Sequence, residues 1–210
     1  MRNVLTAKCQ SSIKIIEEQT MYFDPLKVEE NHDADLIFIT HTHWDHFSKE
    51  DILKIKKDTT KIIGPSDIRE DSLTLGFQEE NIITIKPYQE LTLSNITIKT
   101  VPAYNKEKAF HPKENNWVGY VLTINDQTYY VMGDTDSLEE NENIKCDVLC
   151  IPIGGTYTMN AIEASEFTNK IKPTKVIPIH YGLVVGSKED LDVFKEKVKK
   201  EIKIEEKLNI

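Results

Sequence analysis

Four side chains of types that bind metal ions lie close together in the sequence, at His41, His43, Asp45 and His46. They follow the apolar run 36–39, which is typical of a strand covered on both faces. Because side chains two positions apart in extended backbone point the same way, His41 and His43 can bind one ion together. Asp45 and His46 follow in the loop and can face a second ion. Imidazole and carboxylate groups suit zinc, manganese or iron, so the sequence predicts two divalent metal ions, with zinc as the first choice.

Two further candidate ligands stand at the ends of predicted strands. Asp134 follows the apolar run 127–132, and His180 ends the run 176–179. A carboxylate such as Asp134 can bridge two ions, and the preceding Gly133 lets the backbone approach closely. Read together with the histidine cluster, these two residues favour a metal site assembled from distant parts of the chain.

Short strands and a few helices must position these residues. Capping-box sequences predict helices that begin after Ser48 and Ser187, and a third helix spans 160–171, where Pro173 stops it. Many strands with intervening helices predict an α/β protein with two sheets sandwiched between helices. The strands are expected at 12–17, 21–23, 36–39, 61–63, 82–85, 90–93, 96–101, 118–124, 127–132, 148–153, 176–179 and 202–204.

Bulk properties narrow the function. The 210 residues hold no repeat or linker, so we expect one domain over 1–210. A net charge of −9 argues against nucleic acid and membrane surfaces as partners, and no run approaches the roughly 20 apolar residues of a membrane span. Three cysteines, an odd number, favour a reducing cytoplasm, and Cys146 and Cys150 fit small core residues. We therefore expect a small-molecule substrate; homo-oligomer formation stays open.

Three motifs, 40–46, 133–135 and 179–182, resemble the metallo-β-lactamase-fold superfamily in their order and spacing. The segments 23–25 and 152–159 are similar to its branch of small metal-dependent hydrolases, which includes a phosphorylated-ascorbate lactonase. The resemblance runs from about Asp24 to Gly182. It implies a four-layer αββα sandwich with the site along one edge.

The resemblance also implies a role for each matching residue. Asp24 would orient a ligand histidine. The ligands that it implies are His41 and His43 for the first metal, Asp45, His46 and His180 for the second, and Asp134 as the bridge.

The chain departs from the family pattern at two places. A third histidine for the first metal is expected just after the strand 96–101, where Tyr104 and Asn105 stand instead. His111, a few residues further on, can complete this site, or Asn105 can ligate or help to hold the substrate. The second departure is in the first strand, where the family branch often has a glycine–histidine pair and this chain has Lys8-Cys9-Gln10-Ser11 instead.

The expected reaction is hydrolysis of an ester, lactone or phosphoester bond by a hydroxide that bridges the metals. Asp45 would orient this nucleophile and accept its proton. Tyr157 lies on a glycine-rich loop before the helix 160–171, whose N-terminus can attract an anionic metabolite, so Tyr157 joins Asn105 as a candidate substrate-binding residue. The alternatives are a nuclease or phosphodiesterase on the same centre and a non-catalytic metal-dependent binding protein; di-iron redox chemistry ranks last.

Overall fold

The structure is a computed structural model that describes residues 4–206. These residues form two compact units, the first ending at Ile85 and the second beginning at Lys86. The expected mixed α/β class is confirmed, because the described residues form two multi-stranded sheets and four α-helices. The expectation of a single domain over 1–210 stays a prediction, since it concerns whether the two units fold together.

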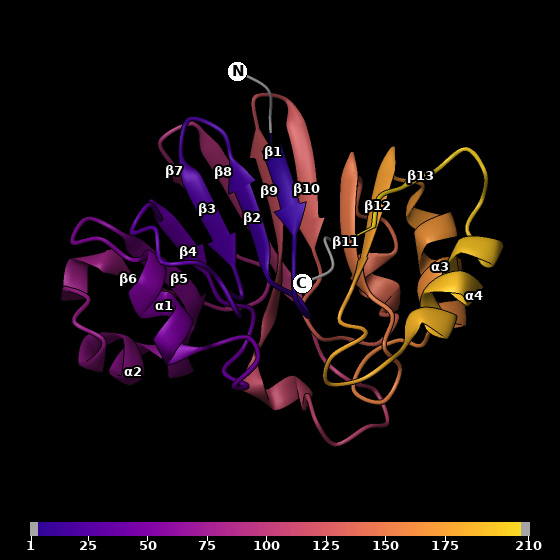
Figure 1. Ribbon diagram of the computed structural model, residues 1–210, viewed down its shortest axis with the longest axis horizontal. Helices are drawn as coiled ribbons and strands as arrows, with labels where there is room; N and C mark the ends of the chain where they lie inside the picture. Colours follow the sequence, from indigo (N-terminus) through magenta and orange to yellow (C-terminus); the bar gives the residue numbers. More distant parts are fainter. Residues whose placement is uncertain (1–3, 207–210) are drawn as a thin grey trace. The chain divides into compact units, whose positions relative to one another are not determined.

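The first unit contains a six-stranded sheet in the order β1-β2-β3-β4-β5-β6. The first three strands pair in antiparallel fashion, and β3 to β6 are parallel. Helix α1 packs on one face through Ile52 and Ile55, and α2 follows beside it (Figure 1). The strands are β1 (Val4–Ala7), β2 (Ile13–Ile16), β3 (Thr20–Phe23), β4 (Leu36–Phe38), β5 (Lys61–Pro65) and β6 (Ile82–Ile85), and the helices are α1 (Lys49–Ile55), η1 (Ser66–Ile68), α2 (Arg69–Thr74) and η2 (Glu79–Asn81).

Parallel pairing in this unit places functional segments at one edge. The carboxyl ends of neighbouring parallel strands meet at the same edge of a sheet. Asp24 follows β3 directly, and the histidine cluster begins three residues after β4 ends at Phe38. The topology therefore brings the Asp-Pro turn to the cluster.

Helix α1 begins at its predicted cap and anchors this edge. Ser48 Oγ accepts a hydrogen bond from the backbone N–H of Asp51 at 3.3 Å, as an N-cap should. The Asp51 carboxylate does not close a capping box; it accepts the backbone N–H groups of Lys27 at 3.0 Å and Val28 at 3.1 Å. The segment that follows Asp24 is thus tied to the helix that follows His46.

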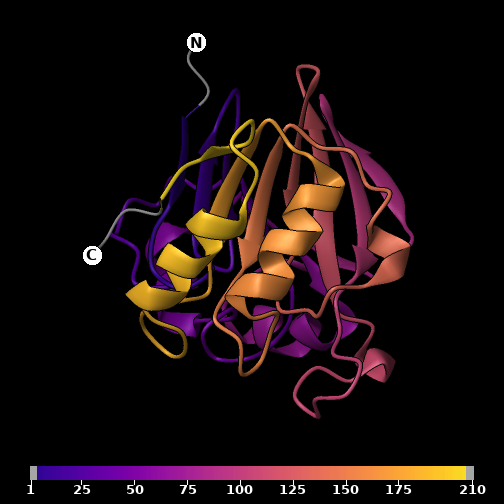
Figure 2. The same cartoon turned by 90° about the vertical axis from the view of Figure 1, so that its right-hand side faces the viewer.

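The second unit contains a seven-stranded sheet in the order β13-β12-β11-β10-β9-β8-β7. Strands β7 to β10 form an antiparallel meander, and β10 to β13 are parallel. Helices α3 and α4 lie side by side on one face, where Phe167 and Phe194 join its core (Figure 2). The strands are β7 (Glu90–Leu93), β8 (Ile96–Pro102), β9 (Val118–Ile124), β10 (Gln127–Val131), β11 (Val148–Pro152), β12 (Lys175–Ile179) and β13 (Lys203–Ile204), and the helices are η3 (Lys113–Asn115), η4 (Glu139–Asn141), α3 (Ala161–Ile171) and α4 (Lys188–Lys197).

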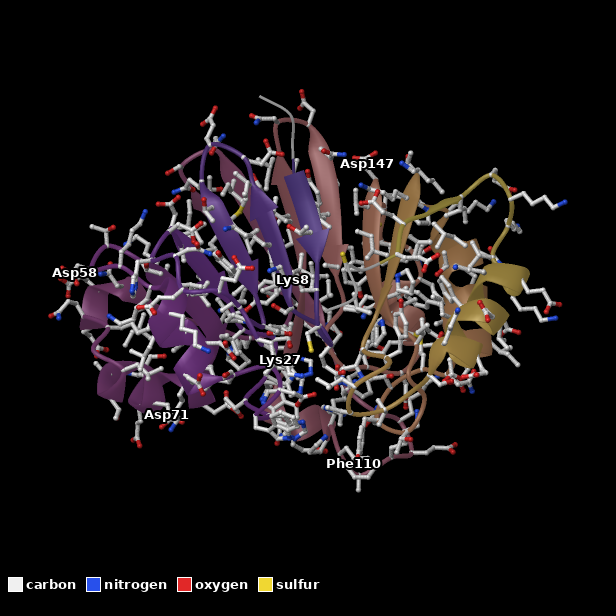
Figure 3. All side chains as sticks on the ribbon, in the orientation of Figure 1. Lys8, Lys27, Asp58, Asp71, Phe110 and Asp147 are labelled. Atoms are coloured by element: carbon white, nitrogen blue, oxygen red, sulfur yellow. The ribbon has the colours of Figure 1, made fainter. Side chains whose placement is uncertain are left out.

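Most predicted elements are present within one or two residues of their expected ends. Besides the short helices η1 to η4, two elements were not predicted. These are β1, which has only four residues, and α2, whose sequence from Arg69 to Thr74 has little apolar periodicity. The helical side of the first unit carries surface charges such as Asp58 and Asp71 (Figure 3), and Asp71 pairs with Lys49 at 2.7 Å. Within residues 4–206, no helix has the length and apolar character to cross a membrane.

Candidate metal centre

The first unit pairs His41 with His43. The Nε2 atom of His41 lies 3.1 Å from the Nδ1 atom of His43. His41 is buried and His43 is half-buried. Two ring nitrogens at this separation can bind a single cation, as the strand spacing predicts.

Hydrogen bonding determines which nitrogen His41 presents. The hydroxyl of Thr40 donates its only proton to Asp24 Oδ2 at 2.7 Å. The same Oγ1 atom lies 3.0 Å from His41 Nδ1 and must therefore accept a hydrogen bond from that nitrogen. The proton of a neutral His41 consequently sits on Nδ1, which leaves the Nε2 lone pair facing His43.

The carboxylate of Asp24 holds the histidine cluster in place through hydrogen bonds to Thr40 and His46. Its fully buried carboxylate accepts hydrogen bonds from the backbone N–H of Thr40 at 2.8 Å and from His46 Nδ1 at 2.7 Å. Burial raises the pKa of the Asp24 carboxyl above its ordinary value, although His46 and Thr40 act in the opposite direction. The predicted contact of Asp24 with a cluster histidine is thus present, and it turns Nε2 of His46 toward Asp45.

The second pair in this unit consists of Asp45 and His46. Asp45 Oδ2 lies 3.6 Å from His46 Nε2. Gln10 Nε2 donates a hydrogen bond to the same Asp45 oxygen at 3.1 Å. No role for Gln10 was predicted from the sequence, where the only signal was that residues 8–11 depart from the family's glycine–histidine pair.

The second unit gathers Asp134, His180 and His111. Asp134 Oδ2 lies 2.8 Å from His180 Nε2 and 3.5 Å from His111 Nε2, and all three side chains are buried. Asp134 follows β10 and His180 follows β12, both in the parallel part of the sheet. His111 lies in the loop that follows β8, which runs parallel to β10 because each is antiparallel to β9. All three residues therefore lie beyond carboxyl ends of strands at the same edge.

Asn105 holds the ring of His111. The amide oxygen Oδ1 can only accept a hydrogen bond, so at 2.9 Å it accepts one from His111 Nδ1, and Nε2 of His111 points to Asp134. Asn105 Nδ2 donates to Asp136 Oδ1 at 3.1 Å and to the carbonyl of Tyr157 at 2.9 Å. These contacts favour His111 over Asn105 as the ligand. The substrate-binding role of Asn105 stays a prediction.

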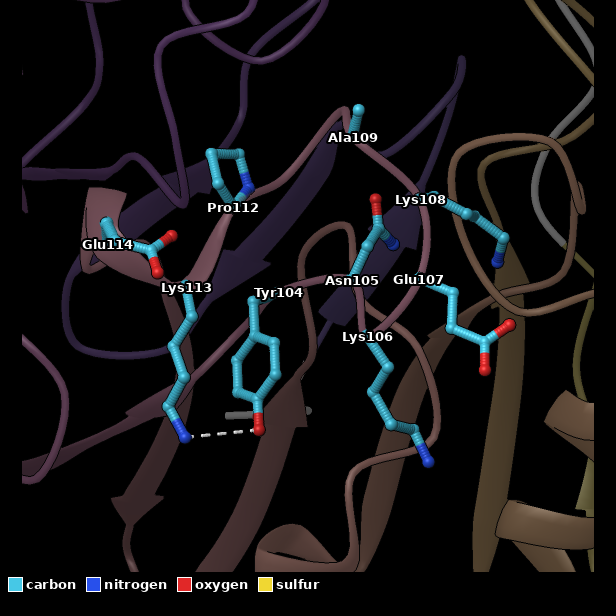
Figure 4. A pocket seen from close by; sticks show the side chains of 9 residues that line it. All are labelled: Tyr104, Asn105, Lys106, Glu107, Lys108, Ala109, Pro112, Lys113 and Glu114. Carbon is cyan, nitrogen blue, oxygen red and sulfur yellow. Dashed lines mark hydrogen bonds between the residues drawn. The ribbon is translucent and has the colours of Figure 1, made fainter.

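The loop that carries His111 also forms an open pocket of about 430 Å³ (Figure 4). In this loop Lys113 Nζ donates to the hydroxyl of Tyr104 at 3.3 Å. Phe110 is 47% exposed at the outer end of the loop (Figure 3), and its ring meets the ring of Tyr157 edge to face at 4.6 Å. The predicted role of Tyr157 in substrate binding is not tested by these contacts, which show that it shares an aromatic surface with Phe110.

The N-terminus of α3 is already satisfied by its own residues. Asn160 Oδ1 accepts the backbone N–H groups of Ile162 and Glu163, and Glu163 Oε2 accepts the N–H of Asn160. This capping box occupies donors that an anionic metabolite would need, and it adds a negative charge there. The helix therefore gives no support to the expected binding of an anionic group.

Cys146 and Cys150 are poorly suited to act as nucleophiles. Burial raises the pKa of the Cys146 thiol to about 12 and also raises the pKa of Cys150. Thiols with such pKa values carry almost no thiolate at neutral pH. Both residues are consistent with the packing role predicted for them.

Comparisons with known proteins agree with this geometry. A family profile described as "Beta-lactamase superfamily domain" matches residues 10–180. A UPF0173 metal-dependent hydrolase of Thermococcus kodakarensis is 32% identical over 173 residues, which cover 79% of this chain and 75% of the relative. The chain belongs to the UPF0173 metal-dependent hydrolases of the metallo-β-lactamase-fold superfamily. A second member of these hydrolases, from Pyrococcus horikoshii, is 30% identical over 176 residues, covering 81% of this chain and 76% of the relative.

Solved structures support the same fold. A protein of Parabacteroides distasonis described as a metal-dependent hydrolase aligns with a TM-score of 0.83 at 25% identity, covering 98% of this chain and 92% of the other. A metallo hydrolase of Ignicoccus hospitalis aligns with a TM-score of 0.74 at 22% identity, covering 96% and 94%. The second likeness concerns the fold alone. The metallo-β-lactamase-like fold expected from the sequence is confirmed.

Proposed function

We propose that this hydrolase is binuclear and cleaves an ester, lactone or phosphoester bond in a small metabolite. One observation carries the proposal: three buried histidines are each held through Nδ1, so that each directs Nε2 toward the other candidate ligands. The partners are the Thr40 hydroxyl for His41, the Asp24 carboxylate for His46 and the Asn105 amide for His111. Histidines that bind metals are characteristically oriented in this way, with one ring nitrogen held by a protein acceptor and the other directed at further metal-binding side chains.

The grouping of ligands within each unit supports the assignment of two ions. The first unit contributes the pairs His41–His43 and Asp45–His46, whose rings meet where His41 and His46 lie 3.9 Å apart between centroids. In the second unit Asp134 stands within reach of both His111 and His180. A carboxylate between two imidazoles is suited to bridging. In the proposed centre, the ligands of the first ion are His41, His43 and His111, those of the second are Asp45, His46 and His180, and Asp134 is shared.

The donor set fits divalent transition metals, with zinc as the first choice and manganese or iron as alternatives. Two such ions, when bound, supply a water of lowered pKa and a Lewis acid for the bond under attack. Asp45 would orient the attacking water and accept its proton, and Gln10 holds one oxygen of this carboxylate through a hydrogen bond. Tyr157 and Phe110 would contact the apolar part of the substrate.

Metal analysis of the purified protein, combined with a substrate panel, tests this proposal. We expect two divalent ions per chain and turnover of at least one ester, lactone or phosphomonoester, lost on chelation and restored by metal. Fewer than two ions after incubation with zinc, manganese or iron would contradict the binuclear centre. Two ions without turnover on any substrate would favour a binding protein, and turnover confined to phosphodiesters would indicate a nuclease or phosphodiesterase.

A further inference from the structure

Gln10 occupies an unfavourable position. It lies between β1 and β2, its side chain is 0% exposed, and its backbone is in the left-handed region with φ of 53°. Burying an amide is unfavourable unless all of its polar atoms find partners, and left-handed backbone is unfavourable for a residue with a Cβ atom. Conformations of this kind persist where the surrounding structure enforces them, often at functional sites.

The contacts of the amide point to Asp45. Gln10 Nε2 donates to Asp45 Oδ2 at 3.1 Å, and this is the oxygen that lies 3.6 Å from His46 Nε2. The carboxylate of Asp45 can only accept, which fixes the amide with Nε2 toward it. The buried Oε1 atom of Gln10 has no hydrogen-bond partner among residues 4–206. An apolar side chain of the same length would avoid this unpaired oxygen, so packing alone does not explain a glutamine here.

We propose that Gln10 is a positioning residue for Asp45, which rests on the proposed binuclear function. Its N–H holds the Asp45 oxygen that would bind the second ion beside His46, and so fixes the orientation of the carboxylate. A neutral amide does this without cancelling the negative charge of Asp45 and without exchanging a proton with it. Partners of this kind around a metal ligand change metal affinity or activity by about 10–100-fold when they are removed.

Metal titration of two variants tests the proposal. Gln10→Met keeps the length and volume of the side chain but has no N–H donor, and Gln10→Asn draws the amide out of reach while tolerating left-handed backbone. We expect both to bind the second ion about 10–100-fold more weakly and the first ion as wild type does. Gln10→His, which offers a ring N–H, should restore most of the affinity. Gln19→Met, the same change at another glutamine of the first unit, is the control and should bind both ions normally.

Circular dichroism and the melting temperature of the chelated protein establish that each variant folds. Unchanged affinity for the second ion in folded Gln10→Met and Gln10→Asn would overturn the role of Gln10 and leave the binuclear proposal standing. Equal loss of both ions would also overturn it, because a general disturbance of the fold would then explain the result. Failure of the wild-type protein to bind two ions would overturn both proposals together.

Discussion

At the scale of single residues, the candidate centre uses three different chemical groups for the same task. A hydroxyl, a carboxylate and an amide oxygen each accept a hydrogen bond from a histidine Nδ1, at His41, His46 and His111. What these acceptors share is that they fix the tautomer and the plane of the ring. The tautomer of each histidine is therefore determined by a neighbour and not by the histidine itself.

Substitution of Asn105 tests whether the neighbour that holds a histidine ring controls metal binding. Asn105→Ala frees the His111 ring, and we expect metal affinity at the first ion to fall by about 10–100-fold. Asn105→Asp keeps the acceptor for His111 Nδ1 and should retain most of the affinity. Calorimetric titration with zinc measures both. A raised KM with metal binding unchanged would instead support the substrate-binding role predicted for Asn105.

The residue scale also shows what sequence alone can deliver. The types and spacing of His41, His43, Asp45 and His46 predicted a metal-binding cluster. The alternation expected of extended backbone was not the reason for their proximity, because β4 ends at Phe38 and all four residues lie in the loop after it. The choice between His111 and Asn105 stayed open, because it depends on how the irregular loop after β8 folds back. The role proposed for Gln10 could not be predicted from the sequence, because it depends on a hydrogen bond to Asp45, which lies 35 positions away.

At the scale of elements, the position of His180 depends on a glycine in another loop. A Cβ atom on Gly154 would lie 2.2 Å from the carbonyl oxygen of His180 and 2.8 Å from Val185 Cγ2. The sequence showed a glycine pair at 154–155 but not what approaches it. The end of β12 can therefore reach its observed position only while residue 154 has no side chain.

Gly154→Ala should displace His180. We expect a loss of stability of roughly 1–3 kcal/mol from overpacking, together with weaker binding of the second ion. Chemical denaturation and metal titration measure the two effects. Gly76→Ala is a suitable control. Its new Cβ atom would meet only Lys56 Nζ, at 4.0 Å, so the expected cost is the backbone strain of a φ of 81° without overpacking. Wild-type metal affinity in Gly154→Ala would show that His180 does not depend on this contact.

The hydrogen bonds between Asp51 of α1 and the segment after Asp24 predict that the stability of the fold depends on pH. Burial by itself would raise the pKa of Asp51, but hydrogen bonds from Ser48, Lys27, Lys54 and Val28 outweigh burial and lower the pKa below the ordinary value of 3.8. A carboxyl with a lowered folded-state pKa stabilises the fold above its unfolded-state pKa, and this contribution is lost as the pH falls through the folded-state pKa.

Asp51→Asn should therefore be less stable than wild type at neutral pH, with a difference that shrinks as the pH falls below about 4. Urea unfolding at a series of pH values measures this. A difference that stays constant down to pH 2 would mean that ionisation of Asp51 does not contribute.

At the scale of the whole molecule, each compact unit contributes only part of the proposed ligand set. Sequence patterns predicted the strands of both units well, because apolar alternation and continuous apolar runs are local signals. They missed α2, whose polar residues from Arg69 to Thr74 are helical through tertiary context. No local signal reports how far apart ligands from separate units lie.

Ions held by residues of both units would stabilise both units. Ligands that bind only the native state add RT ln(1 + [L]/Kd), about 2.7 kcal/mol at a hundredfold excess over Kd. We expect chelation to lower the melting temperature, and excess zinc to restore it, in differential scanning calorimetry. Asp134→Asn should make the protein much less sensitive to both treatments. Identical melting curves with and without chelator would contradict metal binding by the native protein.

The left-handed backbone at Gln10, Asp24 and His180 has a consequence for protein engineering. Glycine adopts this conformation without strain, so selection for thermal resistance alone would favour glycine at these three positions. Each such gain would remove a side chain that the proposed chemistry needs. Engineering for thermal stability should therefore leave these three positions unchanged. A glycine is better introduced at Lys172, an exposed residue with left-handed backbone at the end of α3.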